Sequence, residues 1–203
     1  MKKKISDEWI NDTALLFYQI FSVDYEDVNF NAKLMAGGGG NSTLCSTWTQ
    51  LSNDFLNYRI SKKAYKLLLN LISEEDKKSI IKTKKDITIP KKIIYVKYRG
   101  LFFNNAKGVV NRKNSGKYFH FDHNPSNKKV LSLLKSKVKE KKDNPDFLNE
   151  LTDYVKNIQT VDLITVEEDE IRTCADLKLK DNKMDALERD KLINTEFYNL
   201  HIV

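Results

Sequence analysis

The stretch Tyr118-Phe-His-Phe-Asp-His-Asn-Pro-Ser-Asn127 decides which fold the sequence predicts. Its first half is typical of a β-strand that ends in Asp122-His123, and Pro125 stops that strand. Two of the three histidines of the chain, His120 and His123, flank Asp122. Histidine is the natural general base near neutral pH, and a carboxylate is a preferred ligand of Mg²⁺. The sequence therefore predicts a chemically active strand end at Asp122 and His123, where a bend at Asn124-Pro125 lets both side chains flank one metal-bound phosphate.

The residues that follow predict alternating helices and strands. Apolar residues at helical spacing indicate two helices, and a short apolar run then indicates a strand. Thr165-Val-Glu-Glu168 is a capping box, with threonine at the N-cap and glutamate at N3, so a helix should begin there. The expected order is helix 128–141, helix 145–158, strand 161–165, a helix from Thr165 to about Leu177, helix 184–194 and strand 197–203.

The residues before the central stretch predict a helical region followed by a basic one. Helical periodicity indicates a helix at 6–20 and a helix or helix pair at 61–82, broken near Ser73-Glu-Glu. Residues 87–103 alternate with period two and predict a strand. The glycine run at 36–42 predicts a loop that is either a hinge or a phosphate contact, and a second loop is expected at 104–117. The fold class is therefore α+β.

Charge is segregated along the chain, whose formal net charge is +7. Residues 82–117 contain eleven lysines and arginines and one acid, Asp86, whereas residues 143–176 contain ten acids and two basic residues. A basic surface attracts a phosphate backbone, and gathered carboxylates can hold a divalent metal. Both segments could instead be solvated helix faces, so charge alone leaves the choice open.

Length and composition limit the classes of protein. A chain of 203 residues with 40% hydrophobic residues is long enough for one good core, so we expect a single compact domain spanning 1–203. No apolar run reaches membrane-spanning length, and no apolar segment follows the N-terminal lysines as in a signal peptide. Cys45 and Cys174 are too few for a disulfide framework. These features predict a cytoplasmic protein with reduced thiols.

The element Phe121-Asp-His-Asn-Pro125, with the later Asp162-Leu-Ile-Thr-Val-Glu-Glu-Asp-Glu-Ile-Arg172, resembles an HNH nuclease of the ββα-metal class. The resemblance implies an HNH-like core with additional helices and a basic strand and loop region. It implies that Asp122 ligates Mg²⁺, or another divalent metal such as Mn²⁺, that His123 deprotonates the attacking water, and that Glu170 is the second ligand. The sequence departs from the family in its long gap between the half-motifs and in having glutamate as the last ligand.

The same region also fits a competing pattern. Val161-Asp162 followed by Asp176-Leu-Lys178 matches the loose motif of PD-(D/E)xK nucleases. Under this hypothesis residues 161–166 and 171–179 form a strand hairpin. Asp162 and Asp176 would then hold the metal, and Lys178 would position the attacking water.

The resemblance implies a metal-dependent DNA endonuclease, similar to a small type II restriction endonuclease that cuts a short specific site in double-stranded DNA as a homodimer. A DNA-binding protein without enzymatic activity is the alternative from another class. Residues 1–117 are expected to form a helical and basic DNA-binding region, and residues 118–203 the catalytic region. The residues expected to contact DNA are Lys91, Lys92, Lys97, Arg99, Arg112, Lys113 and Lys117.

Overall fold

The computed structural model describes residues 7–22, 43–52, 55–103, 117–141, 144 and 146–203. The chain forms two compact units, and each is assembled from two separate segments. Unit 1 comprises Met1–Asn57 and His123–Thr160, and unit 2 comprises Tyr58–Asp122 and Val161–Val203. These limits differ from the predicted regions 1–117 and 118–203, because the chain leaves unit 2 after Asp122 and returns to it at Val161.

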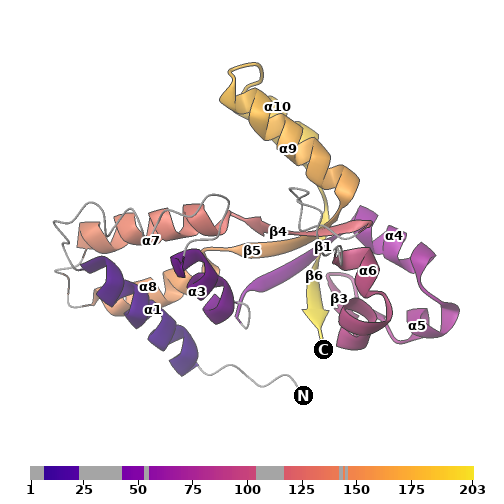
Figure 1. Ribbon diagram of the computed structural model, residues 1–203, viewed down its shortest axis with the longest axis horizontal. Helices are drawn as coiled ribbons and strands as arrows, with labels where there is room; N and C mark the ends of the chain where they lie inside the picture. Colours follow the sequence, from indigo (N-terminus) through magenta and orange to yellow (C-terminus); the bar gives the residue numbers. More distant parts are fainter. Residues whose placement is uncertain (1–6, 23–42, 53–54, 104–116, 142–143, 145) are drawn as a thin grey trace. The chain divides into compact units, whose positions relative to one another are not determined.

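Unit 1 is helical in its described part. It contains α1 (Asp7–Ser22), α3 (Thr43–Ser52), α7 (Asn127–Lys141) and α8 (Phe147–Asn157), in which α1 packs on α7 and α8, and α3 packs on α7 (Figure 1). Phe17 and Trp48 meet edge to face at the centre, with ring centroids 5.5 Å apart. The indole N–H of Trp48 donates to Gln159 Oε1 at 2.8 Å, so the polar atom of this buried ring is satisfied.

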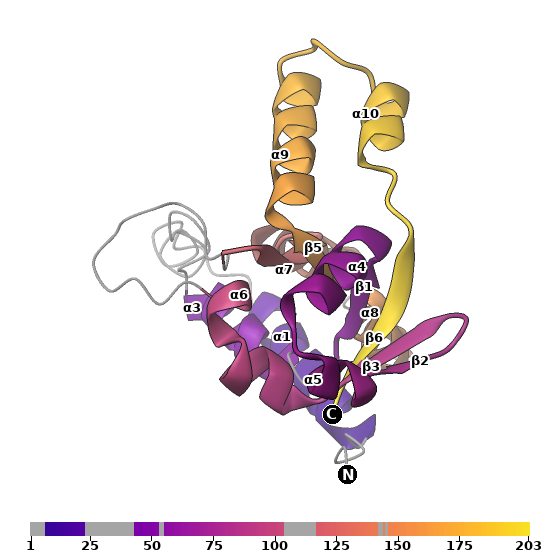
Figure 2. The ribbon, with the colours of Figure 1, turned by 90° about the vertical axis from the view of Figure 1, so that its right-hand side faces the viewer.

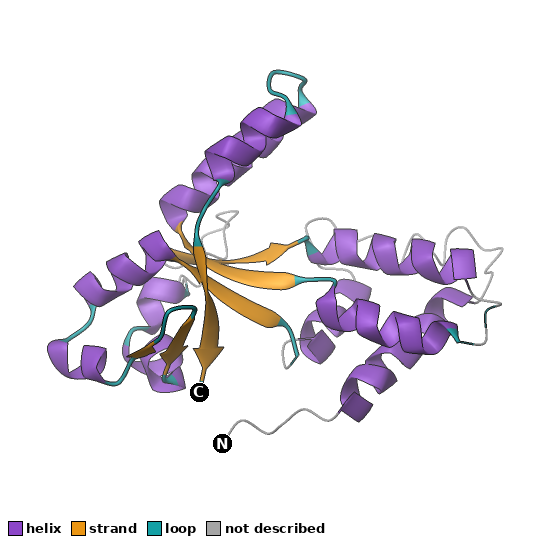
Figure 3. Ribbon diagram, turned by 180° about the vertical axis from the view of Figure 1, so that it is seen from behind, coloured by secondary structure: helices purple, strands orange, loops and turns teal. Residues whose placement is uncertain are grey.

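Unit 2 is built on a mixed sheet with the strand order β2-β3-β6-β1-β5-β4. The strands, orange in Figure 3, are β1 (Asn57–Ser61), β2 (Ile81–Lys82), β3 (Asp86–Ile89), β4 (Phe119–Asn124), β5 (Thr160–Thr165) and β6 (Phe197–Ile202). Strand β6 pairs antiparallel with β1, with Arg59 opposite Asn199, and parallel with β3, with Ile87 opposite Leu200. The core beside this sheet includes Ile60, Leu68, Ile89, Phe102 and Leu163, all fully buried.

Helices flank the sheet and extend from it within unit 2. The segment between β1 and β4 forms α4 (Lys62–Leu71), α5 (Glu74–Lys78), the π-helix η2 (Ile93–Lys97) and α6 (Arg99–Phe102). Ser61 caps α4 by accepting a hydrogen bond from the amide of Ala64 at 2.9 Å. After β5, helices α9 (Val166–Lys180) and α10 (Ala186–Ile193) pack side by side and project from the sheet (Figure 2).

Most of the predicted elements are confirmed. The mixture of helices with a sheet confirms the α+β class. The helices expected at 6–20, 128–141, 145–158 and 184–194 are present as α1, α7, α8 and α10. The strand expected to run from Tyr118 to Asp122-His123 is present as β4, and those at 161–165 and 197–203 are present as β5 and β6. The helix pair at 61–82 is present as α4 and α5, although its last two residues form β2. The glycine-rich loop at 36–42 and most of the basic loop at 104–117 lie outside the described residues.

Two predictions about secondary structure are wrong. The strand expected at 87–103 ends at Ile89, because Pro90 has no amide to continue the ladder. The chain then becomes helical, and the amide of Tyr98 donates to the carbonyl of Ile93. The hairpin that the PD-(D/E)xK hypothesis requires at 161–179 is also absent, because residues 166–180 form the single helix α9.

Candidate functional site

The alternation of side chains along β4 divides its residues between two faces. Phe119 stacks on Phe102 at 4.8 Å between ring centroids, and Phe121 stacks on Phe103 at 5.6 Å, so the phenylalanines pack against α6 and the residue after it. His120, between them, has its Nε2 atom 4.0 Å from a carboxylate oxygen of α9. The helix-facing side of β4 is therefore polar, and the opposite side is aromatic.

The first turn of α9 is fixed by a buried hydrogen-bond network. The hydroxyl of Thr165 accepts from the amide of Glu168 at 3.1 Å, and the carboxylate of Glu168 accepts from the amide of Thr165 at 2.8 Å. This is the capping box that the sequence predicts. Glu168 also accepts a hydrogen bond from Ser61 Oγ at 2.8 Å, which attaches the start of α9 to the end of β1. These hydrogen bonds fix the start of α9 against the ends of β1 and β5.

The first two turns of α9 contact the polar side of β4 at regularly spaced residues. The amide of Val166 donates to the carbonyl of Tyr118 at 3.0 Å. Further along, His120 faces Asp169, with Nε2 and Oδ1 4.0 Å apart. Next, Arg172 Nη1 lies 3.0 Å from an oxygen of Asp122. Every second residue of a strand lies on the same face, and every third residue of a helix lies close to the same face. Residues 118, 120 and 122 therefore meet residues 166, 169 and 172 in turn.

A chain of ion pairs continues from Asp122 into the sheet. Asp162 on β5 is completely buried, and Arg59 on β1 binds it through two hydrogen bonds of 2.7 and 2.8 Å. Arg172 lies 3.4 Å from the same carboxylate and so links Asp162 to Asp122. Both guanidinium groups lie over the ring of Phe197, at 4.6 and 5.4 Å from its centroid. The formal charges of the two arginines and two aspartates cancel.

Two nitrogens of this cluster are buried without a hydrogen-bond partner among the described residues. They are Nδ1 of His120 and Nε of Arg172. A buried polar atom left unpaired costs free energy, so each one calls for an explanation, of which a functional role is one. Nδ1 can accept a proton as the neutral imidazole, and the guanidinium can donate to an anion. His120, Asp122, Asp169 and Arg172 form the candidate site, which we name the β4–α9 site.

The structure brings together only part of the predicted catalytic set. Asp122 lies in the β4–α9 site, but β4 stays extended through Asn124, so His123 follows Phe121 on the alternation and lies on the opposite face from Asp122. Glu170 is exposed and sits two residues before Arg172, about 200° around the helix axis from the side that faces Asp122. The expected bend that was to unite Asp122 with His123 is absent within the strand.

The predicted metal ligands do not form a ligand set. In the part of the chain that the structure describes, no three histidine, cysteine, aspartate or glutamate residues are grouped so as to hold a metal ion. Asp122 accepts a hydrogen bond from Arg172, and both oxygens of Asp162 accept from Arg59. Asp176 and Lys178, the other residues of the PD-(D/E)xK hypothesis, are exposed on α9. The arrangement of these carboxylates therefore does not fit the Mg²⁺ or Mn²⁺ site that the resemblance implies.

The residues predicted to contact DNA fall into three groups. Lys91, Lys92, Arg99 and Lys117 are exposed. Lys97 instead binds the buried carboxylate of Asp76 at 2.7 Å. The hydrogen bond from Lys97 lowers the pKa of Asp76 below its usual range, and Asp76 raises the pKa of Lys97 in turn. Arg112 and Lys113 lie outside the described residues.

Sequence reasoning missed His120 as the histidine on the same face as Asp122, and it missed Arg59, Asp169 and Arg172 altogether. The two-residue spacing of His120 and Asp122 was available as a signal for a shared strand face. The three-residue spacing of Asp169 and Arg172 was equally available as a signal for a shared helix face. Neither spacing shows which face of the strand meets which helix.

Comparison of the chain with protein-family models, with curated proteins and with solved structures found no match. None of the described helices is both long and apolar enough to cross a membrane.

Proposed function

We propose that the protein is a DNA endonuclease that hydrolyses phosphodiester bonds at the β4–α9 site. The observation that carries the proposal is the register between the strand and the helix, which sets a histidine, its carboxylate partner and an arginine side by side. His120 is held 4.0 Å from Asp169, and Arg172 lies two strand residues further on, against Asp122. Strand β4, strand β5 and helix α9 also follow one another in the order that the resemblance to HNH nucleases implies, with α7 and α8 inserted between the two strands.

The chemistry assigned to these residues is hydrolysis with a histidine base. The step requires that water and the phosphate gain access to Nδ1 of His120, which is buried in this structure. Nδ1 then takes a proton from a water molecule while the water oxygen bonds to phosphorus, and the bond from phosphorus to the bridging oxygen breaks. Asp169 stabilises the imidazolium that results, as a carboxylate partner does in hydrolytic triads. The guanidinium of Arg172 supplies positive charge near the negative charge that develops on the phosphoryl oxygens. The leaving oxygen takes its proton from solvent.

No step is assigned to a metal ion, because the described carboxylates do not form a ligand set. A plasmid-cleavage assay measures whether the reaction requires Mg²⁺ or Mn²⁺. Supercoiled plasmid is incubated with the wild-type protein, with either cation or with EDTA, and discrete fragments would support the proposed cutting at a short specific site. Cutting in EDTA would show that the residues of the β4–α9 site suffice.

Two histidine variants test which face of β4 is active. We expect His120→Ala to lower the cleavage rate by about 10²–10⁴-fold, the contribution of a positioned general base. His123→Ala is the matched control, since it removes a neighbouring histidine from the other face of the strand, and its rate should stay within a few-fold of wild type. The reverse outcome would return the general base to His123.

A DNA-binding protein without catalytic activity is the second candidate, and one observation favours it. Asp122, Asp162, Arg59 and Arg172 neutralise one another, as residues with a purely structural role do. This candidate predicts that the wild-type protein retards duplex DNA in a gel but leaves plasmid uncut with either cation and with EDTA. That result would refute the endonuclease.

The proposal includes a homodimer, because a two-fold symmetric DNA site is matched by a two-fold symmetric protein. Four large apolar side chains are exposed on the projecting helices α9 and α10, and burial against a second copy would remove them from water. These side chains are Ile171, Leu177, Leu187 and Leu192. Light scattering coupled to gel filtration measures the mass directly, and a monomer with and without DNA would refute the proposed homodimer.

A further inference from the structure

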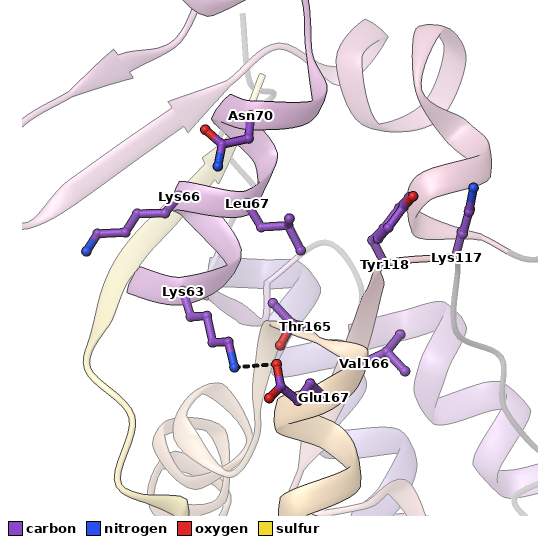
Figure 4. A pocket seen from close by; sticks show the side chains of 9 residues that line it. All are labelled: Lys63, Lys66, Leu67, Asn70, Lys117, Tyr118, Thr165, Val166 and Glu167. Carbon is purple, nitrogen blue, oxygen red and sulfur yellow. Dashed lines mark hydrogen bonds and ion pairs between the residues drawn. The ribbon is translucent and has the colours of Figure 1, made fainter.

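A pocket of about 410 Å³ opens beside the first turn of α9. Its walls come from α4, from the start of α9 and from the residues that lead into β4, all within unit 2 (Figure 4). The volume falls within the range of about 300–1,000 Å³ that is usual for small-molecule sites. The lining residues on which the argument depends are Lys63, Lys66, Leu67, Lys117, Tyr118 and Glu167.

The pocket carries a net positive charge. Lys63 is neutralised by Glu167, with Nζ and Oε2 2.5 Å apart, as the dashed line in Figure 4 marks. Lys66 and Lys117 have no such acidic partner among the residues that the structure describes. Lys117 lies with its ammonium 5.1 Å from the ring centroid of Tyr118. Two cations are therefore left without an acidic partner in the described part of the chain. They lie on opposite sides in Figure 4, where the side chain of Lys66 extends outward from α4 and must turn inward to meet a ligand.

Between the two lysines the walls combine apolar and aromatic side chains with Thr165 and the Lys63–Glu167 pair. Leu67 reaches inward from α4, and Val166 and the ring of Tyr118 lie across from it (Figure 4). Such a surface suits a flat ring, and aromatic side chains are the usual platforms on which nucleic-acid bases stack. The ligand that matches the whole pocket therefore has a flat ring in the middle and an anion at each end.

Two of the first three amides of α9 are already engaged in hydrogen bonds. The amide of Val166 already donates to the carbonyl of Tyr118, and that of Glu168 donates to Thr165. Affinity for an anion must come from the lysine side chains instead, since lysine is an effective phosphate ligand.

We propose that the pocket binds one nucleotide of the DNA, with its base against Tyr118 and Leu67 and its two flanking phosphates on Lys66 and Lys117. The inference rests on the proposed function, because it identifies the pocket as a substrate subsite of the β4–α9 site. Tyr118 precedes His120 by two residues, immediately before β4 begins, and its carbonyl is hydrogen-bonded to α9. A nucleotide in the pocket would therefore hold the neighbouring part of the strand beside His120.

The test is calorimetric titration of the full chain with thymidine 3′,5′-bisphosphate, thymidine 5′-monophosphate and thymidine. The bisphosphate should bind most tightly and thymidine most weakly, because each phosphate meets one lysine. Lys66→Gln and Lys117→Gln should each weaken binding of the bisphosphate by about tenfold, and each should reduce its salt dependence. Lys180→Gln removes the same charge from the far end of α9 and should leave affinity unchanged.

Equal affinity of the three probes would overturn the inference, as would a bisphosphate affinity that neither pocket lysine alters. The titration involves no cleavage, so its outcome is separate from that of the endonuclease proposal. Loss of plasmid cutting in His120→Ala with bisphosphate binding intact would support both proposals. Bisphosphate binding in a wild-type protein that never cuts plasmid would leave the pocket in place and remove only the nuclease.

Discussion

Replacing Arg59 with methionine should destabilise the protein strongly, although the residue is one-third exposed. Methionine keeps an apolar side chain over Phe197 but removes both hydrogen bonds to Asp162. The carboxylate of Asp162 has no exposed surface, so it cannot recover these bonds from water. An uncompensated buried charge is therefore the dominant cost.

The magnitude follows from the contacts that remain. Removing one partner of a buried ion pair costs about 3–5 kcal/mol. Arg172 stays 3.4 Å from Asp162, so we expect a loss in the free energy of unfolding near the lower limit, about 3 kcal/mol. For a chain of this length the melting temperature would fall by roughly 6–12 °C.

Two further variants isolate the buried charge as the cause. Arg59→Met combined with Asp162→Leu removes both charges and should regain at least half of the lost stability. Lys63→Met breaks the exposed pair with Glu167 and should cost only about 0–1 kcal/mol.

Urea denaturation followed by far-ultraviolet circular dichroism measures these differences. Tryptophan fluorescence recorded in parallel reports on unit 1 alone, because Trp9 and Trp48 both lie there. The reasoning is refuted if Arg59→Met loses no more stability than Lys63→Met, or if the double variant is less stable than the single one.

Three other outcomes are expected. The hydrogen bond from Lys97 lowers the pKa of Asp76 in the folded protein. The contribution of Asp76 to stability is therefore complete above its unfolded pKa of about 3.9 and is lost as pH falls through the folded pKa. When the urea midpoint is plotted against pH, Asp76→Asn should make the decrease at acid pH less steep. Thr165→Ala should lower the free energy of unfolding by about 0.5–2 kcal/mol through loss of the N-cap, measured by urea titration. Reversing Lys91 and Lys92 to glutamate should weaken DNA binding at every sequence and reduce the salt slope by about 2, and an unchanged slope would exclude these side chains from the interface.

Local signals in the sequence predict much of the fold. The capping box at Thr165 and Glu168 identifies the start of α9 because both hydrogen bonds are made within four residues. The run Ile93-Ile-Tyr-Val96 misleads because residues with strand propensity here form the π-helix η2. Ile93 and Ile94 are both buried although they are neighbours, which is a pattern of a helix face rather than of an alternating strand.

The candidate site is harder to predict because its partners are distant along the chain. Arg59 and Asp162 are separated by 103 positions, and Asp122 and Arg172 by 50. Charge patterns could show that residues 143–176 are acidic, but they could not show that arginines neutralise Asp122 and Asp162. Which histidine, His120 or His123, lies beside α9 likewise depends on which face of β4 meets that helix. Strand alternation shows that the two histidines lie on opposite faces, but it does not show which face packs against α9.

The place of β6 in the sheet has a consequence for how the protein is made. Strand β6, near the end of the chain, pairs with β1 on one side and β3 on the other. On a ribosome that adds about 5–20 residues per second, β1 and β3 leave the exit tunnel well before the strand that joins them, by roughly 5–30 s. Until residues 197–202 emerge, the facing edges of β3 and β1 both stay unpaired, and the sheet of unit 2 cannot be completed.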